Sequence, residues 1–311
     1  MTTAWSWQPD AAGRIEQPVG LLRLDGAGAR RFLHGQTTAA IETAPAQAWI
    51  SSCCTSPTGR MRAPIEVLLD GDGAWVAIHG VPFEQAAGVR QAFDRVLFPA
   101  DQVQLGPLQP GWLAAPVGPS PSPSPWPTGP SGQWLELEEG RSWLLGEQVL
   151  RLDTAAIPGW LAERPALAAG DQERWRLQQG IPAAPGEIND DTNPFELGLA
   201  KRVNLSKGCY LGQETLAKLA TYDGVKQQLR RWCSATPLAP GTRLNGPDGS
   251  KAGVVSSSLA LGDGSGIGLA LIRRQALEQP TLLTGEGSPA QELAISLPER
   301  FSAPPGSAIR S

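Results

Sequence analysis

The chain has 311 residues, of which 41% are hydrophobic and 18% charged, a composition typical of a folded protein of two or three domains. Its net charge of −4 argues against a generic nucleic-acid partner, and no apolar run is long enough to span a membrane. Four cysteines without a Cys-x-x-Cys pair, and two histidines, argue against a disulfide framework and a histidine-rich zinc site. The first 17 residues lack the order of a signal peptide, which predicts a cytoplasmic protein.

The first part of the chain predicts strands and helices in alternation, which indicates an α+β domain. Strands are expected at 20–24, 59–69 and 74–79, the last two joined by a hairpin at 70–73. Asp25 is expected to cap a helix that carries Phe32 and Leu33, and a second helix should follow Pro82 over 83–97.

Residues 116–132 are rich in proline and serine and predict an exposed, extended insertion. A hairpin is expected at 134–137 and 142–145, and a helix at 171–179 that ends at Gly180.

After Tyr222 the pattern changes to short strand candidates separated by turns rich in glycine, asparagine and proline, which predicts a small antiparallel β barrel. These candidates are 229–233, 242–244, 252–257, 267–272, 281–283 and 293–296. Gly264-x-Gly266-x-Gly268 is interpreted as a hairpin turn, because a strand and not a helix follows it. We therefore expect an α+β domain over 1–224 and a barrel domain over 225–311, with a frayed tail from Phe301.

The octapeptide Lys-Gly-Cys-Tyr-Leu-Gly-Gln-Glu at 207–214 combines a thiol, an ammonium, a phenol, an amide and a carboxylate. A helix is expected over 215–220, so Cys209 would lie in a loop before a helix N-terminus with Lys207 two residues away. Both features favour thiolate over thiol. An inert buried cysteine in an ordinary turn is the alternative interpretation.

Positive charge gathers around this octapeptide. Between Ala200 and Trp232 there are seven Lys or Arg residues against Glu214 and Asp223, so the local excess is seven minus two, or +5, in an acidic chain. A solvated basic face would account for it, but its position around Cys209 favours a pocket for an anionic small molecule.

The octapeptide resembles the Lys-Gly-Cys-Tyr/Phe-x-Gly-Gln-Glu signature of YgfZ-type folate-binding proteins, which are relatives of the glycine cleavage T-protein, an aminomethyltransferase. Weaker matches fall in the right order from about Gly20 to Arg274, and the insertion at 116–132 is a departure. They include Arg-Phe-Leu-His-Gly-Gln-Thr-Thr at 31–38, Ser-Pro-Thr-Gly-Arg-Met at 56–61, Gly-Ile-Pro at 180–182 and Pro-Phe-Glu-Leu-Gly-Leu at 194–199.

This resemblance implies an aminomethyltransferase-like α+β fold with a C-terminal barrel, and tetrahydrofolate or a one-carbon derivative as the ligand. It also implies a role in assembling or repairing iron–sulfur clusters in partner enzymes, and thereby in cluster-dependent tRNA modification. No direct nucleic-acid partner and no membrane are expected. The candidate residues are Cys209 as functional thiol with Lys207, and Glu196, Arg202, Tyr210, Gln213, Glu214 and Arg230 for the ligand.

The sequence departs from the T-proteins at one chemically important turn. T-proteins have an acidic pair where aligning Gly59 places Ala63 and Pro64, and Glu66 comes two or three residues too late. Because neither residue can accept a proton, aminomethyltransferase turnover is not expected and the chain is unlike an ordinary enzyme of that type.

Two alternatives stay open from the sequence. A tetrahydrofolate-dependent one-carbon transferase or demethylase would need another carboxylate, with Glu196 and Glu214 as candidates. A thiol hydrolase would pair Cys209 with His34 or His79, each of which is also interpreted as a local hydrogen bonder. Cys53, Cys54 and Cys233 are expected to be small core residues.

Overall fold

The computed structural model describes residues 2–119, 127–285 and 290–306, and in it the chain forms two compact units that interleave along the sequence. We call Gln8–Ala168 with Arg202–Gln213 the sheet unit. Met1–Trp7, Ala169–Lys201 and Glu214–Ser311 form the barrel unit. These contacts group 169–201 with the barrel strands, whereas the sequence predicts a domain boundary after residue 224. That boundary stays a prediction.

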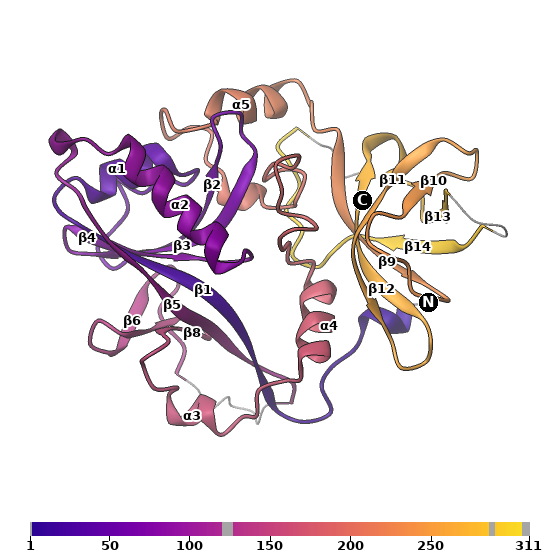
Figure 1. Cartoon of the computed structure of the whole chain (residues 1–311), viewed down its shortest axis with the longest axis horizontal. Helices are drawn as coiled ribbons and strands as arrows, with labels where there is room; N and C mark the ends of the chain where they lie inside the picture. Colours follow the sequence, from indigo (N-terminus) through magenta and orange to yellow (C-terminus); the bar gives the residue numbers. More distant parts are fainter. Residues whose placement is uncertain (1, 120–126, 286–289, 307–311) are drawn as a thin grey trace. The chain divides into compact units, whose positions relative to one another are not determined.

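The sheet unit is built on one antiparallel sheet with the strand order β2-β3-β4-β1-β5-β8-β7-β6 (Figure 1). Its strands are β1 (Gly13–Asp25), β2 (Trp49–Thr55), β3 (Met61–Asp70), β4 (Gly73–Ile78), β5 (Gln104–Val117), β6 (Trp134–Glu138), β7 (Ser142–Leu145) and β8 (Gln148–Leu152). Its helices are α1 (Ala29–Gln36), α2 (Phe83–Val96), the short α3 (Gly159–Ala162) and the 3-10 turn η2 (Pro99–Asp101).

Strand β1 divides the core of the sheet unit between the two faces of the sheet. Leu22 and Leu24 are buried in one cluster with the apolar faces of α1 and α2. Leu21 lies in a second cluster with Trp134 and Trp143, which come from the β6–β7 hairpin. This division follows from the strand geometry, because successive side chains point to opposite faces. Each fully buried leucine contributes about 1.5–3 kcal/mol of transfer free energy.

The predicted strands, helices and hairpins of this part are present, but two expectations need correction. Strand β1 begins at Gly13 rather than Gly20, and Asp25 does not cap α1. The N-cap residue is Gly28, without a side-chain hydrogen bond, while the Asp25 carboxylate pairs with Arg23 at 2.7 Å. In the predicted insertion, β5 still includes Pro116 and Val117, so the first residues belong to the sheet; residues 120–126 lie outside the described part.

The barrel unit contains a closed antiparallel barrel with the strand order β10-β11-β12-β9-β14-β13. Its strands are β9 (Gln227–Ser234), β10 (Arg243–Asn245), β11 (Lys251–Ala260), β12 (Gly266–Arg273), β13 (Thr281–Thr284) and β14 (Glu292–Ser296). All six predicted strands are confirmed. Of the predicted turn at 264–268, Gly264 lies between β11 and β12, whereas Gly266 and Gly268 already belong to β12 and pair with its neighbours. Four helical segments complete this unit: α4 (Ala169–Gln179), α5 (Gln213–Thr221), and the 3-10 turns η1 (Thr2–Trp5) and η4 (Arg274–Ala276). A further 3-10 turn, η3 (Ala200–Arg202), leads from the barrel unit to the sheet unit. No helix in the described ranges is long and apolar enough to cross a membrane.

Candidate functional site

The cysteine motif lies in a loop, residues 202–213, that belongs to the sheet unit although its neighbours in sequence belong to the barrel unit. Thr38, a fully buried residue just after α1, fixes the start of this loop. Its hydroxyl donates to the Arg202 carbonyl oxygen at 2.6 Å, and its own carbonyl accepts from the Asn204 amide at 2.8 Å. We call residues 202–213 the cysteine loop.

A reciprocal pair of contacts fixes the middle of the cysteine loop to α1. The Lys207 ammonium donates to the His34 carbonyl oxygen, and His34 Nε2 lies 2.7 Å from the Lys207 carbonyl oxygen. His34 Nδ1 accepts from the amides of Ile41 and Glu42 at 3.2 and 3.1 Å, so Nε2 carries the proton. Both ring nitrogens are therefore engaged by backbone groups, and His34 has none left to deprotonate a thiol.

The end of the cysteine loop is fixed to α1 and to the end of β2. Leu211 donates its amide to the Gly35 carbonyl at 3.0 Å and accepts the Thr55 hydroxyl at 2.7 Å. Gly212 has φ +85°, and a Cβ there would lie 2.7 Å from the Ser56 carbonyl oxygen. Glycine is required at this position both for its backbone conformation and for the close approach of two chain segments.

Between these attachments the loop exposes Cys209 and buries its neighbour Tyr210. The Lys207 ammonium nitrogen lies 4.6 Å from the centre of the Tyr210 ring, so the ring covers part of this cation. Burial lowers the pKa of Lys207 to about 8, and the nearby charge of Glu42 opposes that shift. Helix α5 begins at Gln213, four residues after the thiol, so Cys209 itself is not at the helix N-terminus.

The other three cysteines are buried, as the sequence predicts. Burial raises the pKa of Cys53 to about 12, and the pKa values of Cys54 and Cys233 are also raised, chiefly by burial. Cys209 is therefore the exposed thiol among four in the chain, all of which lie in described segments.

Arg202, the first residue of the cysteine loop, is half-buried and directs its guanidinium to a buried carboxylate. Its Nη1 lies 2.9 Å from Glu66 Oε1 and donates to the Ile65 carbonyl. The other oxygen of Glu66 accepts from the Trp49 indole and the Ser51 hydroxyl, each at 2.7 Å. Although burial raises the pKa of Glu66, the Arg202 charge and the hydrogen bonds from His79 and Ser51 hold it well below its usual range.

His79 completes the polar cluster around Glu66. Its Nε2 lies 3.3 Å from Glu66 Oε1, while Nδ1 is buried without a hydrogen-bond partner among the described residues. Burial lowers the pKa of His79, which favours the neutral ring. Sequence reasoning dismissed Glu66 as too late for a T-protein acid and did not identify the cluster. A carboxylate inside the apolar run of β3 was the available signal, since such a group is seldom buried unless it is paired.

The remaining predicted residues are not all gathered in the cysteine loop. Gln213 donates its backbone amide to Tyr210 at 3.1 Å within it. Glu214 is 83% exposed and pairs with Lys218 in α5 at 2.6 Å. Glu196 and Arg230 belong to the barrel unit, where the Glu196 carbonyl accepts from Leu229 at 2.8 Å.

The side chains of Glu196 and Arg230 differ in their surroundings. The Glu196 carboxylate is buried and accepts from the Asn193 amide at 3.1 Å. Arg230 packs its guanidinium 5.1 Å from the Phe301 ring centre, and burial lowers its pKa to about 10.

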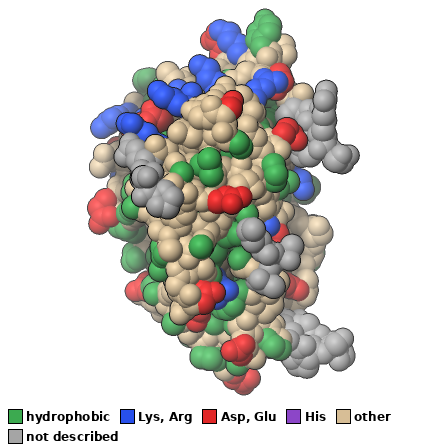
Figure 2. All heavy atoms as spheres, turned by 90° about the vertical axis from the view of Figure 1, so that its right-hand side faces the viewer, with side chains coloured by type: hydrophobic (Ala, Val, Ile, Leu, Met, Phe, Trp, Pro, Cys, Tyr) green, Lys and Arg blue, Asp and Glu red, His purple; other side chains and the backbone are tan. Residues whose placement is uncertain are grey.

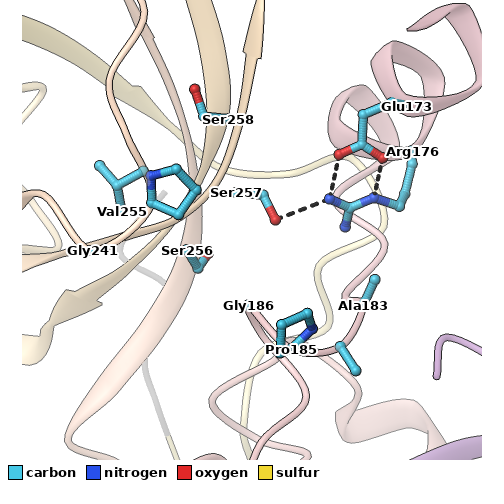
Figure 3. A pocket seen from close by; sticks show the side chains of 12 residues that line it. Glu173, Arg176, Ala183, Pro185, Gly186, Gly241, Val255, Ser256, Ser257 and Ser258 are labelled. Carbon is cyan, nitrogen blue, oxygen red and sulfur yellow. Dashed lines mark hydrogen bonds and ion pairs between the residues drawn. The ribbon is translucent and has the colours of Figure 1, made fainter. Parts of the chain in front are cut away.

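A hollow of about 650 Å³ in the barrel unit lies between α4, residues 183–186, residues 240–241 and strand β11 (Figure 3). Arg176 dominates its polar wall. The guanidinium contacts both oxygens of Glu173 at 2.7 Å and Glu187 at 3.2 Å, and it also bonds the Ser257 hydroxyl and the Ile181 carbonyl. Because these contacts use all five N–H groups, Arg176 has none left for the carboxylate of a ligand.

The described residues contain no group of three or more His, Cys, Asp or Glu side chains placed to hold a metal ion.

No protein-family model matches the chain. A chloroplastic protein of Arabidopsis thaliana, named a candidate transferase, is 29% identical over 83% of this chain, and the chain spans 64% of that protein's length. The tRNA-modifying protein YgfZ of Serratia proteamaculans is 24% identical over 93% of this chain and 94% of its own.

The fold matches a solved structure, the glycine cleavage system aminomethyltransferase T from Bartonella henselae. The TM-score is 0.75 over 97% of this chain and 90% of that chain, at 15% identity. The expected α+β fold with a closed antiparallel barrel is thus confirmed. The Serratia relative extends over almost the whole of both proteins. The chain is thus similar to YgfZ-type proteins over most of its length and has the fold of the glycine cleavage aminomethyltransferase.

Proposed function

We propose that the chain is a folate-binding accessory protein that supports the assembly or repair of iron–sulfur clusters, with Cys209 as its functional thiol. Its ligand is tetrahydrofolate or a one-carbon derivative, its partners are iron–sulfur client or assembly proteins, and its place is the cytoplasm. Cluster-dependent tRNA modification would follow indirectly. The Serratia relative's name and the aminomethyltransferase fold support this class of function.

The presentation of Cys209 is the observation that carries the proposal. Three sets of hydrogen bonds, at Thr38, His34 and Thr55, fix the cysteine loop, yet the thiol between them is exposed. A thiol kept in the core would be inert, and a thiol on a loose loop would not be positioned. A single positioned thiol suits transient ligation or redox contact with a partner's cluster, rather than permanent binding.

The residues around the loop have the chemistry that a folate requires. Folate ends in carboxylates, and Lys207 is a partly buried cation for which no carboxylate lies within ion-pair distance among the described residues. The ring of Tyr210 is buried beside the ammonium, and its hydroxyl has no partner in the described part. Lys207 would bind a carboxylate and Tyr210 would keep water from that contact. When bound, the folate would supply one-carbon chemistry.

Four further residues remain proposed contacts of the folate, and substitution of each can be tested by titration with tetrahydrofolate. They are Glu196, Gln213, Glu214 and Arg230. For Arg202 the buried pair with Glu66 changes the expected effect of mutation, because removing the guanidinium destabilises the unit as well as any ligand site.

Aminomethyl transfer is poorly supported by the same geometry. Ala63 and Pro64, on β3, carry no acid, and the nearby Glu66 carboxylate is held as an anion by Arg202. A one-carbon transferase or demethylase would have to use Glu196 or Glu214, of which Glu214 lies on the surface of α5. Single-turnover assays with methylene-tetrahydrofolate distinguish this alternative from the accessory role. A transferase or demethylase would consume the methylene group, whereas an accessory protein would leave it on the folate.

Calorimetric titration with tetrahydrofolate tests the ligand proposal. Binding should weaken as the pH rises through about 8, because the Lys207 ammonium is lost there. Lys207→Gln should bind weakly and without that pH dependence, while Lys201→Gln, an exposed neighbour, should behave as the wild type. No binding at millimolar ligand would refute the folate proposal.

Complementation of a strain deficient in iron–sulfur enzymes tests the thiol. Cys209→Ser should fold and fail to complement, and Cys233→Ser should complement. Full activity of Cys209→Ser would leave the loop as scaffold only.

A further inference from the structure

A large aromatic side chain stands in solvent at the end of α5. Tyr222 is 79% exposed, which is the highest value among the large hydrophobic side chains of the residues that the structure describes. Its amide donates to the Lys218 carbonyl at 3.0 Å, so the backbone is ordered as the last turn of the helix. An aromatic ring held in water offers a flat surface on which another ring can stack.

Hydrogen bonds connect this helix end to one end of the barrel within the same unit. The Arg274 guanidinium bonds the carbonyl and the carboxylate of Asp223, and the Arg274 amide donates to Lys226 at 2.9 Å. Gln275 in turn donates to the Lys251 carbonyl at 3.2 Å. Strands β9 and β11 begin at this end of the barrel, and β12 ends there. Arg273 at the end of β12 is paired with Gln227 at the start of β9.

Five exposed basic residues therefore share this end of the barrel unit with Tyr222. They are Lys218, Lys226, Lys251, Arg273 and Arg274, and we call them, with Tyr222, the Tyr222 surface. Four acids belong to or flank it: Glu214, Asp223, Asp248 and Glu278. Five minus four leaves +1 in a chain of net −4. Figure 2 shows Lys and Arg side chains most numerous towards the upper end of the face it draws, where Asp and Glu side chains lie among them.

We propose that the Tyr222 surface binds single-stranded nucleic acid, with a base stacked on the Tyr222 ring and phosphates on Lys226, Lys251 and Arg273. Lys218 and Arg274 already pair with Glu214 and Asp223 and are not counted as phosphate contacts. Stacking with cations along the backbone is how such strands are bound without sequence preference. An acidic protein surface would also fit the charges, and the comparison with polyglutamate below distinguishes it from a nucleic acid. The sequence predicts no nucleic-acid partner from the net charge, but that charge is an average over the chain, and binding depends on the local surface. The proposal is independent of folate.

Fluorescence anisotropy with labelled 12-nucleotide RNA and DNA homopolymers, at 50 and 200 mM salt, tests this surface. Wild-type protein should bind more weakly at the higher salt, because each phosphate contact contributes a slope of about −0.7 in log K against log salt. Tyr222→Ala should weaken binding by about 5- to 100-fold, the effect of losing one stacked base, and Tyr222→Phe should bind nearly as the wild type. Lys226→Glu should weaken binding and reduce the salt slope.

Matched controls come from the sheet unit. Phe98 is 68% exposed and Arg95 is also exposed, so Phe98→Ala and Arg95→Glu remove an exposed ring and an exposed charge elsewhere. Both should bind as the wild type. Absence of binding at 50 mM salt would overturn the proposal. So would equal affinity of Tyr222→Ala and wild type, or equal affinity of the wild type for polyglutamate, which has charge but no bases.

Discussion

Burial separates Cys209 from the other three thiols, and the separation should be visible as reactivity. Cys53, Cys54 and Cys233 are buried with raised pKa values, so near neutral pH they hold little of the thiolate that reacts with alkylating agents. Iodoacetamide at pH 7.5, followed by peptide mass spectrometry, should label Cys209 first. Labelling of Cys53 or Cys54 at a comparable rate in folded protein would contradict the burial of β2.

The Arg202–Glu66 pair predicts a large stability effect from one substitution. Removing one partner of a buried ion pair leaves the other charge uncompensated, which costs about 3–5 kcal/mol. Arg202→Met should therefore lower the free energy of unfolding in urea by about that amount, while Lys218→Met, from an exposed pair, should change it little.

A double substitution distinguishes the lost pair from lost packing. Arg202→Met combined with Glu66→Gln should be less destabilising than Arg202→Met alone, because the unpaired charge is gone. Equal stability of the single and double variants would attribute the loss to packing.

His79 predicts acid sensitivity in a defined range. Burial lowers its pKa in the folded chain, whereas an unfolded histidine titrates near about 6.5. The unfolded state then binds more protons below that pH, so stability falls as the pH drops from 7 towards 5. Glu66, whose pKa is depressed, adds loss in the same direction only below about 4.3. His79→Gln should flatten the dependence between pH 7 and 5, measured by urea unfolding. The same slope in wild type and variant would assign the effect to other groups.

At the scale of an element, the two glycines of the octapeptide have different structural roles. Both have positive φ, +97° at Gly208 and +85° at Gly212, but a Cβ meets nothing within 4 Å at Gly208. Alanine at either position carries backbone strain of about 1–3 kcal/mol. Gly212→Ala should cost more in urea unfolding, because its Cβ also collides with the Ser56 carbonyl, and it should speed proteolysis of the cysteine loop. If Gly208→Ala and Gly212→Ala lower the free energy of unfolding equally, the β2–β3 turn can move to accommodate the added Cβ.

The elements were predictable where a local pattern determines them. Turns rich in glycine and proline bound all six barrel strands, and Pro82 marks the start of α2. The Asp25 cap was wrong because the aspartate pairs with Arg23 on its own strand. The cysteine motif was recognisable as a site, but its attachments to Thr38 and His34 link residues more than 160 positions apart. No pattern within the motif encodes such partners.

At the scale of the whole molecule, the division into two units and the predicted domain boundary after residue 224 lead to opposite expectations for the folding of fragment 1–224. Leu177, on α4, is fully buried in a cluster with Leu229 and Leu269 of the barrel strands. Arg231 of β9 also donates to the Gln178 carbonyl at 2.9 Å. A chain that ends at residue 224 would lose these partners and expose the apolar side of α4.

Limited trypsin digestion of fragment 1–224 beside the complete chain measures the difference. If 169–201 depends on the barrel, Arg174 and Arg176 should be cleaved early in the fragment and late in the complete chain, while 8–168 resists cleavage in both. The buried clusters of the sheet unit are internal to 8–168, which is the reason for that resistance. Equal protection of 169–201 in the fragment would instead support a continuous domain over 1–224, with the barrel packed on it as a separate folding unit.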